Sequence, residues 1–153
     1  MPKRRVFISY QHQDQMKAKG FNLMRYNENL DLDFVGRHLL DPVNSTNADY
    51  ISRMIREQIT GSSATVVLIG KDTADSDWVA QEIQWSLEKG NGIVGVKLDP
   101  DAAIPPGLDE CGAEILEWSE VTTEFTDAVE RAITATARGQ NMPLNSSSTC
   151  ARA

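Results

Sequence analysis

The stretch Ala64-Thr65-Val66-Val67-Leu68-Ile69-Gly70 decides the fold of this 153-residue chain. Its apolar and β-branched residues lead directly to a glycine, a pattern typical of a strand that is buried on both faces of a parallel sheet. We therefore predict a central strand over residues 64–69.

Shorter segments on either side predict the other strands. Residues 5–9 contain the continuous apolar run Val6-Phe7-Ile8, and residues 93–98 are mostly apolar, so each range predicts a strand. Residues 32–35 are short, partly alternating and bounded by polar residues, which predicts an edge strand. Residues 115–118 predict a short fifth strand, and the proline-containing residues 99–107 predict a loop.

Apolar residues at helical spacing lie between these strands. The predicted helices cover residues 15–26, the segment from the capping group 44–47 to Gly61, the segment from Asp75 or Ser76 to Gly90, and residues 125–133. Strands that alternate with helices indicate right-handed βαβ crossovers and a parallel sheet covered on both faces. The predicted fold is therefore α/β, in three layers, with five strands in flavodoxin-like order.

Length and composition indicate one domain. With 41% hydrophobic residues, the chain can fill one core, which we assign to residues 1–138. Residues 139–153 are polar, serine-rich and without periodicity, which predicts a disordered tail.

Charge and cysteine content restrict the partners and the compartment. A net charge of -7 repels phosphate backbones and anionic lipids, so neither nucleic-acid binding nor membrane binding is expected. No apolar run reaches membrane-spanning length. The two cysteines, Cys111 and Cys150, are not expected to gain much from pairing and fit a reducing cytoplasm.

The third predicted helix carries the strongest candidate for a functional residue. Ligands of open parallel sheets bind beyond the carboxyl ends of the strands, so Glu82 should overlook the binding edge. Trp78 and Glu82 are four residues apart and therefore share one flank of the helix. The alternative is that Glu82 only favours the helix dipole while Trp78 covers the core. Spacing alone favours this structural interpretation.

Three motifs together resemble TIR domains in residue type, order and spacing. They are Val6-Phe7-Ile8-Ser9-Tyr10 followed by Asp14, then Val66-Val67-Leu68-Ile69-Gly70, then Ser76-Asp77-Trp78 leading to Glu82. The segment from Trp78 to Val96 looks, more narrowly, like the TIR-like subunit of the bacterial Thoeris antiphage system. The resemblance covers about residues 3–118.

This resemblance implies a flavodoxin-like fold and, in the enzymatic members, cleavage of the nicotinamide–ribose bond of NAD. It implies that Glu82 is the catalytic residue and that NAD is a substrate, with no separate cofactor. The product would be a cyclic ADP-ribose isomer that diffuses to a separate effector protein. Assembly with other TIR domains, including copies of the same chain, is implied as well.

The implied chemistry is physically reasonable for a single carboxylate. Nicotinamide leaves as a neutral molecule, so no general acid is required. Positive charge gathers on the ribose in the transition state, and a fixed anion stabilises that charge preferentially. Capture of the cation by water gives ADP-ribose, whereas capture by an adenine nitrogen gives a cyclic product, and the sequence does not decide between the two.

Further substrate-binding residues are predicted around Glu82 on the same resemblance: Ser9, Tyr10, Gln11, His12, Asp14, Ser45 and Trp78. Tyr10 and Trp78 could stack on nicotinamide or adenine. Asp14 could cap the first helix and contact ribose or phosphate, although Ser9 and Asp14 can equally be structural caps. Ser45 belongs to the loop 44–47, which matches the place where TIR domains close over substrate.

Other chemistries have weaker support in the sequence. His12 and His38 have no partner at metal-ligand spacing, so no metal site is predicted. The segment Gly90-Asn91-Gly92 follows a helix and precedes a strand, the wrong order for a phosphate loop. Two rival functions stay open: a TIR module that acts only by assembly, and a deoxyribosyltransferase-like enzyme that acts on nucleosides.

Overall fold

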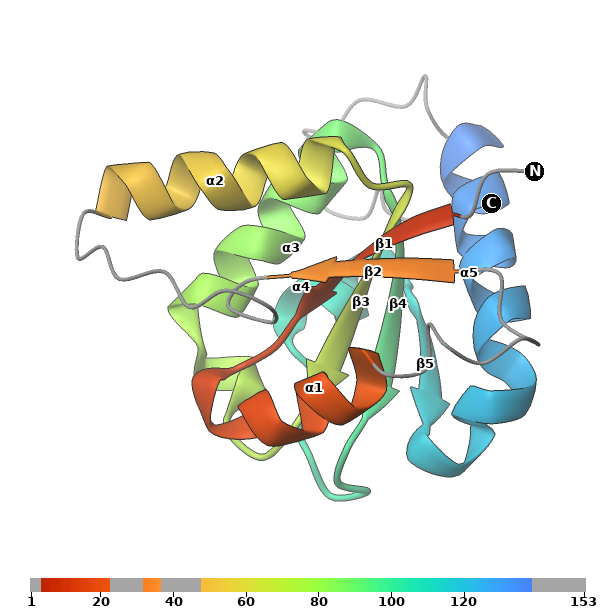
Figure 1. The fold of residues 1–153 in the computed structure, drawn as a ribbon. Coiled ribbons are helices and arrows are strands. Elements are labelled where there is room, and N and C mark those ends of the chain that lie inside the picture. The colour runs from red at the N-terminus through yellow and green to blue at the C-terminus, as the bar shows by residue number, and fades with distance from the viewer. Residues whose placement is uncertain (1–3, 23–31, 37–47, 139–153) are drawn as a thin grey trace.

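The structure is a computed structural model that describes residues 4–22, 32–36 and 48–138 (Figure 1). Five strands form one sheet: β1 (Arg4–Ser9), β2 (Leu32–Gly36), β3 (Ala64–Ile69), β4 (Gly92–Lys97) and β5 (Glu114–Glu117). Their order is β2-β1-β3-β4-β5, and every pair of neighbours is parallel. The predicted flavodoxin-like α/β fold is confirmed, with residues 64–69 in the centre of the sheet.

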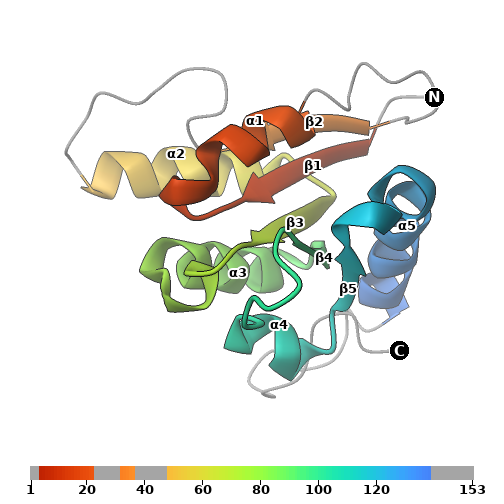
Figure 2. The same cartoon turned by 90° about the horizontal axis from the view of Figure 1, so that it is seen from below.

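The helices connect these strands in sequence order. They are η1 (His12–Asp14), α1 (Gln15–Asn22), α2 (Ala48–Thr60), η3 (Thr73–Asp75), α3 (Asp77–Lys89), α4 (Pro106–Cys111), η4 (Trp118–Glu120) and α5 (Val121–Arg138). Figure 2 shows α3 and α5 on opposite sides of β3 and β4. The domain therefore has the three layers that the sequence predicts.

Each face of the sheet has its own core, because successive side chains of a strand point to opposite faces. Val6, Ile8 and Tyr10 pack with residues of α1 and α5 in one cluster. On the other face, Val67 and Ile69 pack with α3 and α4, whereas Phe7 packs with Ile55 and Ile59 of α2. All six residues of β3 are buried, as expected of a strand covered on both sides.

Helix α3 begins and ends where the sequence predicts. The Ser76 hydroxyl accepts a hydrogen bond from the amide of Val79 at 3.3 Å, which caps the first turn. Gly90 ends the helix in the left-handed conformation, with φ of 85°, where a glycine carries no penalty. The capping residues therefore fix which turn of α3 lies over the end of β1.

Some predicted boundaries differ from the structure. β4 and β5 each begin and end one residue earlier than predicted. Helix α4 lies partly within the predicted loop 99–107, because Pro106 occupies the first helical position, where its missing N–H is not needed. Residues 23–26 of the predicted first helix, the capping group 44–47 and the predicted tail 139–153 lie outside the described residues.

Two further observations concern membrane-spanning segments and the cysteines. No helix in the part of the chain that the structure describes is both long and apolar enough to span a membrane. Cys111 is buried and disulfide-bonded. The prediction that Cys111 gains little from pairing therefore differs from the structure.

Candidate functional site

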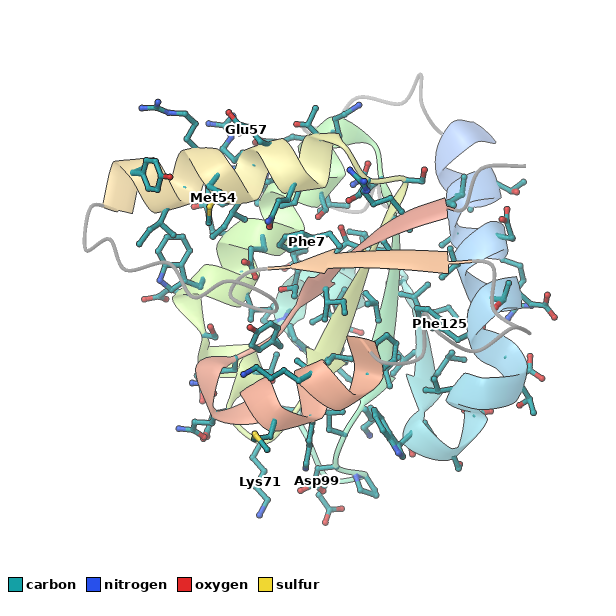
Figure 3. The ribbon with its side chains drawn as sticks, in the orientation of Figure 1. Phe7, Met54, Glu57, Lys71, Asp99 and Phe125 are labelled. Atoms are coloured by element: carbon teal, nitrogen blue, oxygen red, sulfur yellow. The ribbon has the colours of Figure 1, made fainter. Side chains whose placement is uncertain are left out.

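The candidate site lies where β1 and β3 end, at the edge of the sheet to which all the strands point, called here the carboxyl edge. Ser9 is the last residue of β1 and pairs in register with Val67 of β3. Strand order reverses between β1 and β3, and open parallel sheets bind ligands at such a switch point. Lys71 and Asp99, which follow β3 and β4, mark the same edge in Figure 3.

Glu82 of α3 reaches this edge and contacts β1. The Ser9 hydroxyl donates a hydrogen bond to Oε1 of Glu82 at 2.6 Å, across 73 positions of sequence. A separation of 2.6 Å is typical of a hydroxyl that donates to an ionised carboxylate. The prediction that Glu82 lies at the carboxyl edge therefore agrees with the geometry.

The exposure of Glu82 differs from what the sequence suggested. Its side chain is 0% exposed, as is that of Ser9, and the second carboxylate oxygen is also shielded from solvent. The reason lies in helical spacing, because Glu82 shares the buried face of α3 with Val79, Ile83 and Ser86. Glu82 is therefore not an open carboxylate at the rim but an enclosed one that lies against β1.

Two hydroxyl groups that the sequence analysis did not predict as site residues help to hold the backbone of Glu82, one directly and one through the other. The Ser86 hydroxyl donates to the carbonyl oxygen of Glu82 at 2.8 Å. The Thr65 hydroxyl of β3 lies 2.7 Å from that of Ser86 and must supply the proton between them, since the Ser86 proton is already used. Thr65 and Ser86 are both fully buried. We call Ser9, Thr65, Glu82 and Ser86 the polar cluster.

The polar cluster lies on the face of the sheet covered by α2, α3 and α4. Phe7 and Thr65 pair in register, as do Ser9 and Val67, so the cluster alternates with apolar residues along both strands. Figure 3 shows Phe7 beneath α2, with Glu57 on the outer side of that helix. A sequence signal for the cluster was present, because Thr65 is the polar residue of an otherwise apolar strand, and Ser86 lies with Glu82 among apolar residues on the buried face of α3.

Tyr10 does not fit the role that the sequence suggested. Its side chain is 1% exposed and belongs to the core cluster with Val6, Ile8 and Phe21. A ring in that position cannot stack on a nucleotide, so the stacking prediction for Tyr10 is corrected. Alternation along β1 explains the result, since Tyr10 continues the series of Val6 and Ile8.

The predicted loop residues Gln11 and Trp78 are accessible to different extents. Gln11 is half-buried, and its side-chain oxygen accepts from the amide of Gln13 at 2.6 Å, which stabilises the turn after β1. Trp78 is 36% exposed in the first turn of α3, one turn before Glu82. Trp78 is thus available to a ligand near the carboxyl edge, although the Glu82 carboxylate is not.

Asp14 joins the connection after β1 to the connection after β3. Its carboxylate lies against Gly70 and forms a side-chain hydrogen bond with Thr73. Partial burial raises the pKa of Asp14 above its ordinary value of 3.8. Lys17 opposes this shift, Asp72 adds to it, and the Thr73 hydroxyl opposes it. These contacts suit a structural role between two loops of the carboxyl edge.

The remaining predicted residues cannot be assigned. Ser45 and the loop around it lie outside the described residues, as does His38, and the same holds for the side chain of His12. Within the described ranges, no three His, Cys, Asp or Glu side chains come together as metal ligands. Gly36, the last residue of β2, pairs in register with Ile8, one residue before Ser9.

Comparison with known proteins points to one family. Residues 7–103 match the family described as Thoeris protein ThsB, TIR-like domain. A curated relative from Bacillus cereus (strain MSX-D12), named "Putative cyclic ADP-D-ribose synthase ThsB1", is 32% identical over 101 residues. The matched part is 63% of this chain and 52% of the relative, so the chain spans about half the length of that protein.

Two solved structures of TIR domains are similar to this chain, and the first of them supports the fold. The TIR domain of the Toll-related receptor TRR-2 from Hydra magnipapillata has a TM-score of 0.57 and 21% identity, over 84% of this chain and 97% of that one. The TIR domains of the activated Roq1 resistosome have a TM-score of 0.48 and 19% identity, over 97% and 95% of the two chains. The Hydra domain shows that the architecture is that of a TIR domain.

Proposed function

Because the chain belongs to the TIR-like domain family of Thoeris protein ThsB, we propose that it cleaves the nicotinamide–ribose bond of NAD, with Glu82 as the catalytic carboxylate. One observation carries the proposal: a carboxylate is held by a serine hydroxyl at the switch point of the sheet. The cyclic ADP-D-ribose synthase name of the Bacillus relative supports the choice of reaction.

In the proposed reaction, the bond between C1 of the ribose and the nicotinamide nitrogen breaks, and both electrons stay with nicotinamide. The positive charge that was on the pyridinium moves to the ribose, where the Glu82 anion stabilises it. An adenine nitrogen of the same molecule then forms the new bond and gives a cyclic ADP-ribose. NAD is the substrate, and no further cofactor takes part.

The enclosed position of Glu82 determines how the site would work. A carboxylate removed from water acts more strongly on a nearby cation, because the local dielectric is low. The ribose must nevertheless come within contact distance of a side chain that is 0% exposed. Catalysis therefore requires the carboxyl edge to open around Ser9 and Glu82. The cyclic product would diffuse to a separate effector protein.

A second candidate function is assembly with other TIR domains without catalysis. The full burial of Glu82 supports this second function, since a purely structural carboxylate would also be enclosed and hydrogen-bonded. The two functions differ in one consequence: only an enzyme loses a reaction when the charge of Glu82 is removed.

The test compares the purified protein with Glu82→Gln, which keeps shape and removes charge, and with Glu88→Gln, a control at an exposed position of α3. Each is incubated with NAD or with nucleosides, alone and in extract from phage-infected cells, and products are resolved by mass spectrometry. We expect nicotinamide and a cyclic ADP-ribose from NAD, and a loss of about 10²-fold or more in Glu82→Gln only.

Three results would decide against the proposal. Equal NAD turnover by wild type and Glu82→Gln would remove the assigned role of Glu82. Turnover of nucleosides in place of NAD would assign a different substrate. Absence of any product, in buffer and in infected extract, would leave assembly as the function.

A further inference from the structure

We propose that Ser9 is a positioning residue that holds the Glu82 carboxylate in place, and not a contact to the substrate. The expected effect of Ser9 on catalysis rests on the proposed function. The expected effect of Ser9 on the Glu82 carboxylate does not. The sequence suggested that Ser9 binds substrate or caps a turn. The contacts of its hydroxyl indicate a third role.

The first argument is the number of protons available. A serine hydroxyl has one proton, and the proton of Ser9 is donated to Oε1 of Glu82 at 2.6 Å. Ser9 is also 0% exposed, so a sugar hydroxyl cannot approach it from solvent in this conformation. While Glu82 is held as described, Ser9 has no proton to offer a ligand.

The second argument is the cost of an enclosed carboxylate. An ionised group removed from water is costly unless hydrogen bonds replace the lost solvent. The Ser9 hydroxyl is such a donor, at a distance typical of a bond to a charged acceptor. Ser9 thus helps to keep the Glu82 carboxylate in one orientation, as a group that must face a developing positive charge requires.

The third argument separates positioning from folding. The backbone of Glu82 is held independently, because its carbonyl oxygen accepts from Ser86 and Ser86 in turn bonds to Thr65. Helix α3 also keeps its own cap at Ser76. Removal of the Ser9 hydroxyl should therefore take one hydrogen bond from the carboxylate without displacing the helix turn that carries it.

The test uses Ser9→Ala, with Ser9→Thr as the variant that retains a hydroxyl. Ser62→Ala is the matched control, since its buried hydroxyl bonds to the carbonyl oxygen of Gln58, before β3 begins. Each protein is labelled with ¹³C at glutamate carboxyl carbons. The Glu82 resonance is identified as the one that Glu82→Gln lacks, and its chemical shift is followed with pH.

We expect the Glu82 resonance of Ser9→Ala to be displaced from its wild-type chemical shift across the pH range, because the carboxyl group has lost a hydrogen-bond donor. Ser62→Ala should titrate like wild type, and Ser9→Thr should lie between wild type and Ser9→Ala or match wild type. An unchanged resonance in Ser9→Ala would overturn the proposal. This readout needs no enzymatic activity.

The kinetic arm then separates the two proposals. If NAD is cleaved, Ser9→Ala should lower kcat about 10-fold or more with little change in KM, whereas a substrate contact would raise KM. A raised KM with unchanged kcat would return Ser9 to the substrate-binding residues and overturn the positioning role. If no protein cleaves NAD, the proposed function fails, and the carboxyl resonance still decides the role of Ser9.

Discussion

The carboxylate of Asp14 lies directly against the backbone of Gly70. A Cβ atom added at Gly70 would lie 2.7 Å from Oδ1 of Asp14 and 2.8 Å from its Cγ, closer than real Cβ atoms approach such neighbours. Gly70 is also held by Thr73, whose hydroxyl accepts from its amide at 2.8 Å. The loops that follow β1 and β3 are therefore fitted to each other at the site.

Gly70→Ala should destabilise the domain by about 1–3 kcal/mol, because the new methyl group and the Asp14 carboxylate cannot occupy the same space. Gly20→Ala is the control, since Gly20 is exposed in α1 and a Cβ there meets nothing within 4 Å. That substitution should stabilise by about 0.5–1 kcal/mol. Urea unfolding measures the change in the free energy of unfolding for each variant. A higher free energy of unfolding for Gly70→Ala would contradict the described contact.

The hydroxyls of Thr65 and Ser86 should prove energetically coupled. Ser86→Ala leaves the buried Thr65 hydroxyl without this acceptor, at a cost of about 1–3 kcal/mol, and Thr65→Val should act similarly on Ser86. The double substitution should lower the free energy of unfolding by clearly less than the sum of the losses from the two single substitutions. A double-mutant cycle in urea measures the difference, and strict additivity would show that the bond contributes nothing.

Local sequence patterns were sufficient to predict most of the fold. Residues 64–69 could be identified because a central parallel strand is apolar throughout, and α3 because Ser76 and Gly90 fit its two ends. Helix α4 was missed because a proline reads as loop unless its position in the first turn is recognised.

The candidate site was predicted less completely, since its contacts join distant parts of the chain. The position of Glu82 at the carboxyl edge follows from topology, but its burial depends on Ser9, 73 residues away, which no periodicity reveals. Tyr10 was misread because its motif suggested a loop ligand, whereas alternation from Val6 and Ile8 assigns it to the core.

The raised pKa of Asp14 predicts a specific dependence of stability on pH. A carboxyl that binds its proton more tightly in the folded state contributes stability that is fully present below pH 3.8 and is lost as pH rises through the folded-state pKa. Wild type should therefore lose stability relative to Asp14→Asn as the pH rises from below 3.8 through the folded-state pKa of Asp14.

Urea unfolding of both proteins across this pH range measures the effect. The other carboxyl groups contribute equally to both proteins, so their contributions cancel in the difference between the two free energies of unfolding. Gly20→Ala changes no charge and should keep a constant difference from wild type. A difference between wild type and Asp14→Asn that grows in favour of wild type as pH rises would contradict the direction of the shift.

The enclosure of Glu82 should be visible in its chemical reactivity. Carbodiimide activates a carboxylate only where reagent and amine can reach it, and the Glu82 side chain is 0% exposed, whereas Glu88 on the same helix is exposed. In the folded, isolated protein we expect labelling at Glu88 and almost none at Glu82, as measured by peptide mass spectrometry. In urea both should be labelled, which shows that Glu82 is protected by the fold and not by its neighbours in sequence. If Glu82 is labelled as fast as Glu88 in the folded protein, the site is open at rest and the proposed cleavage of NAD needs no rearrangement of the carboxyl edge. Protection of Glu82 would instead require that edge to open before any substrate is cleaved.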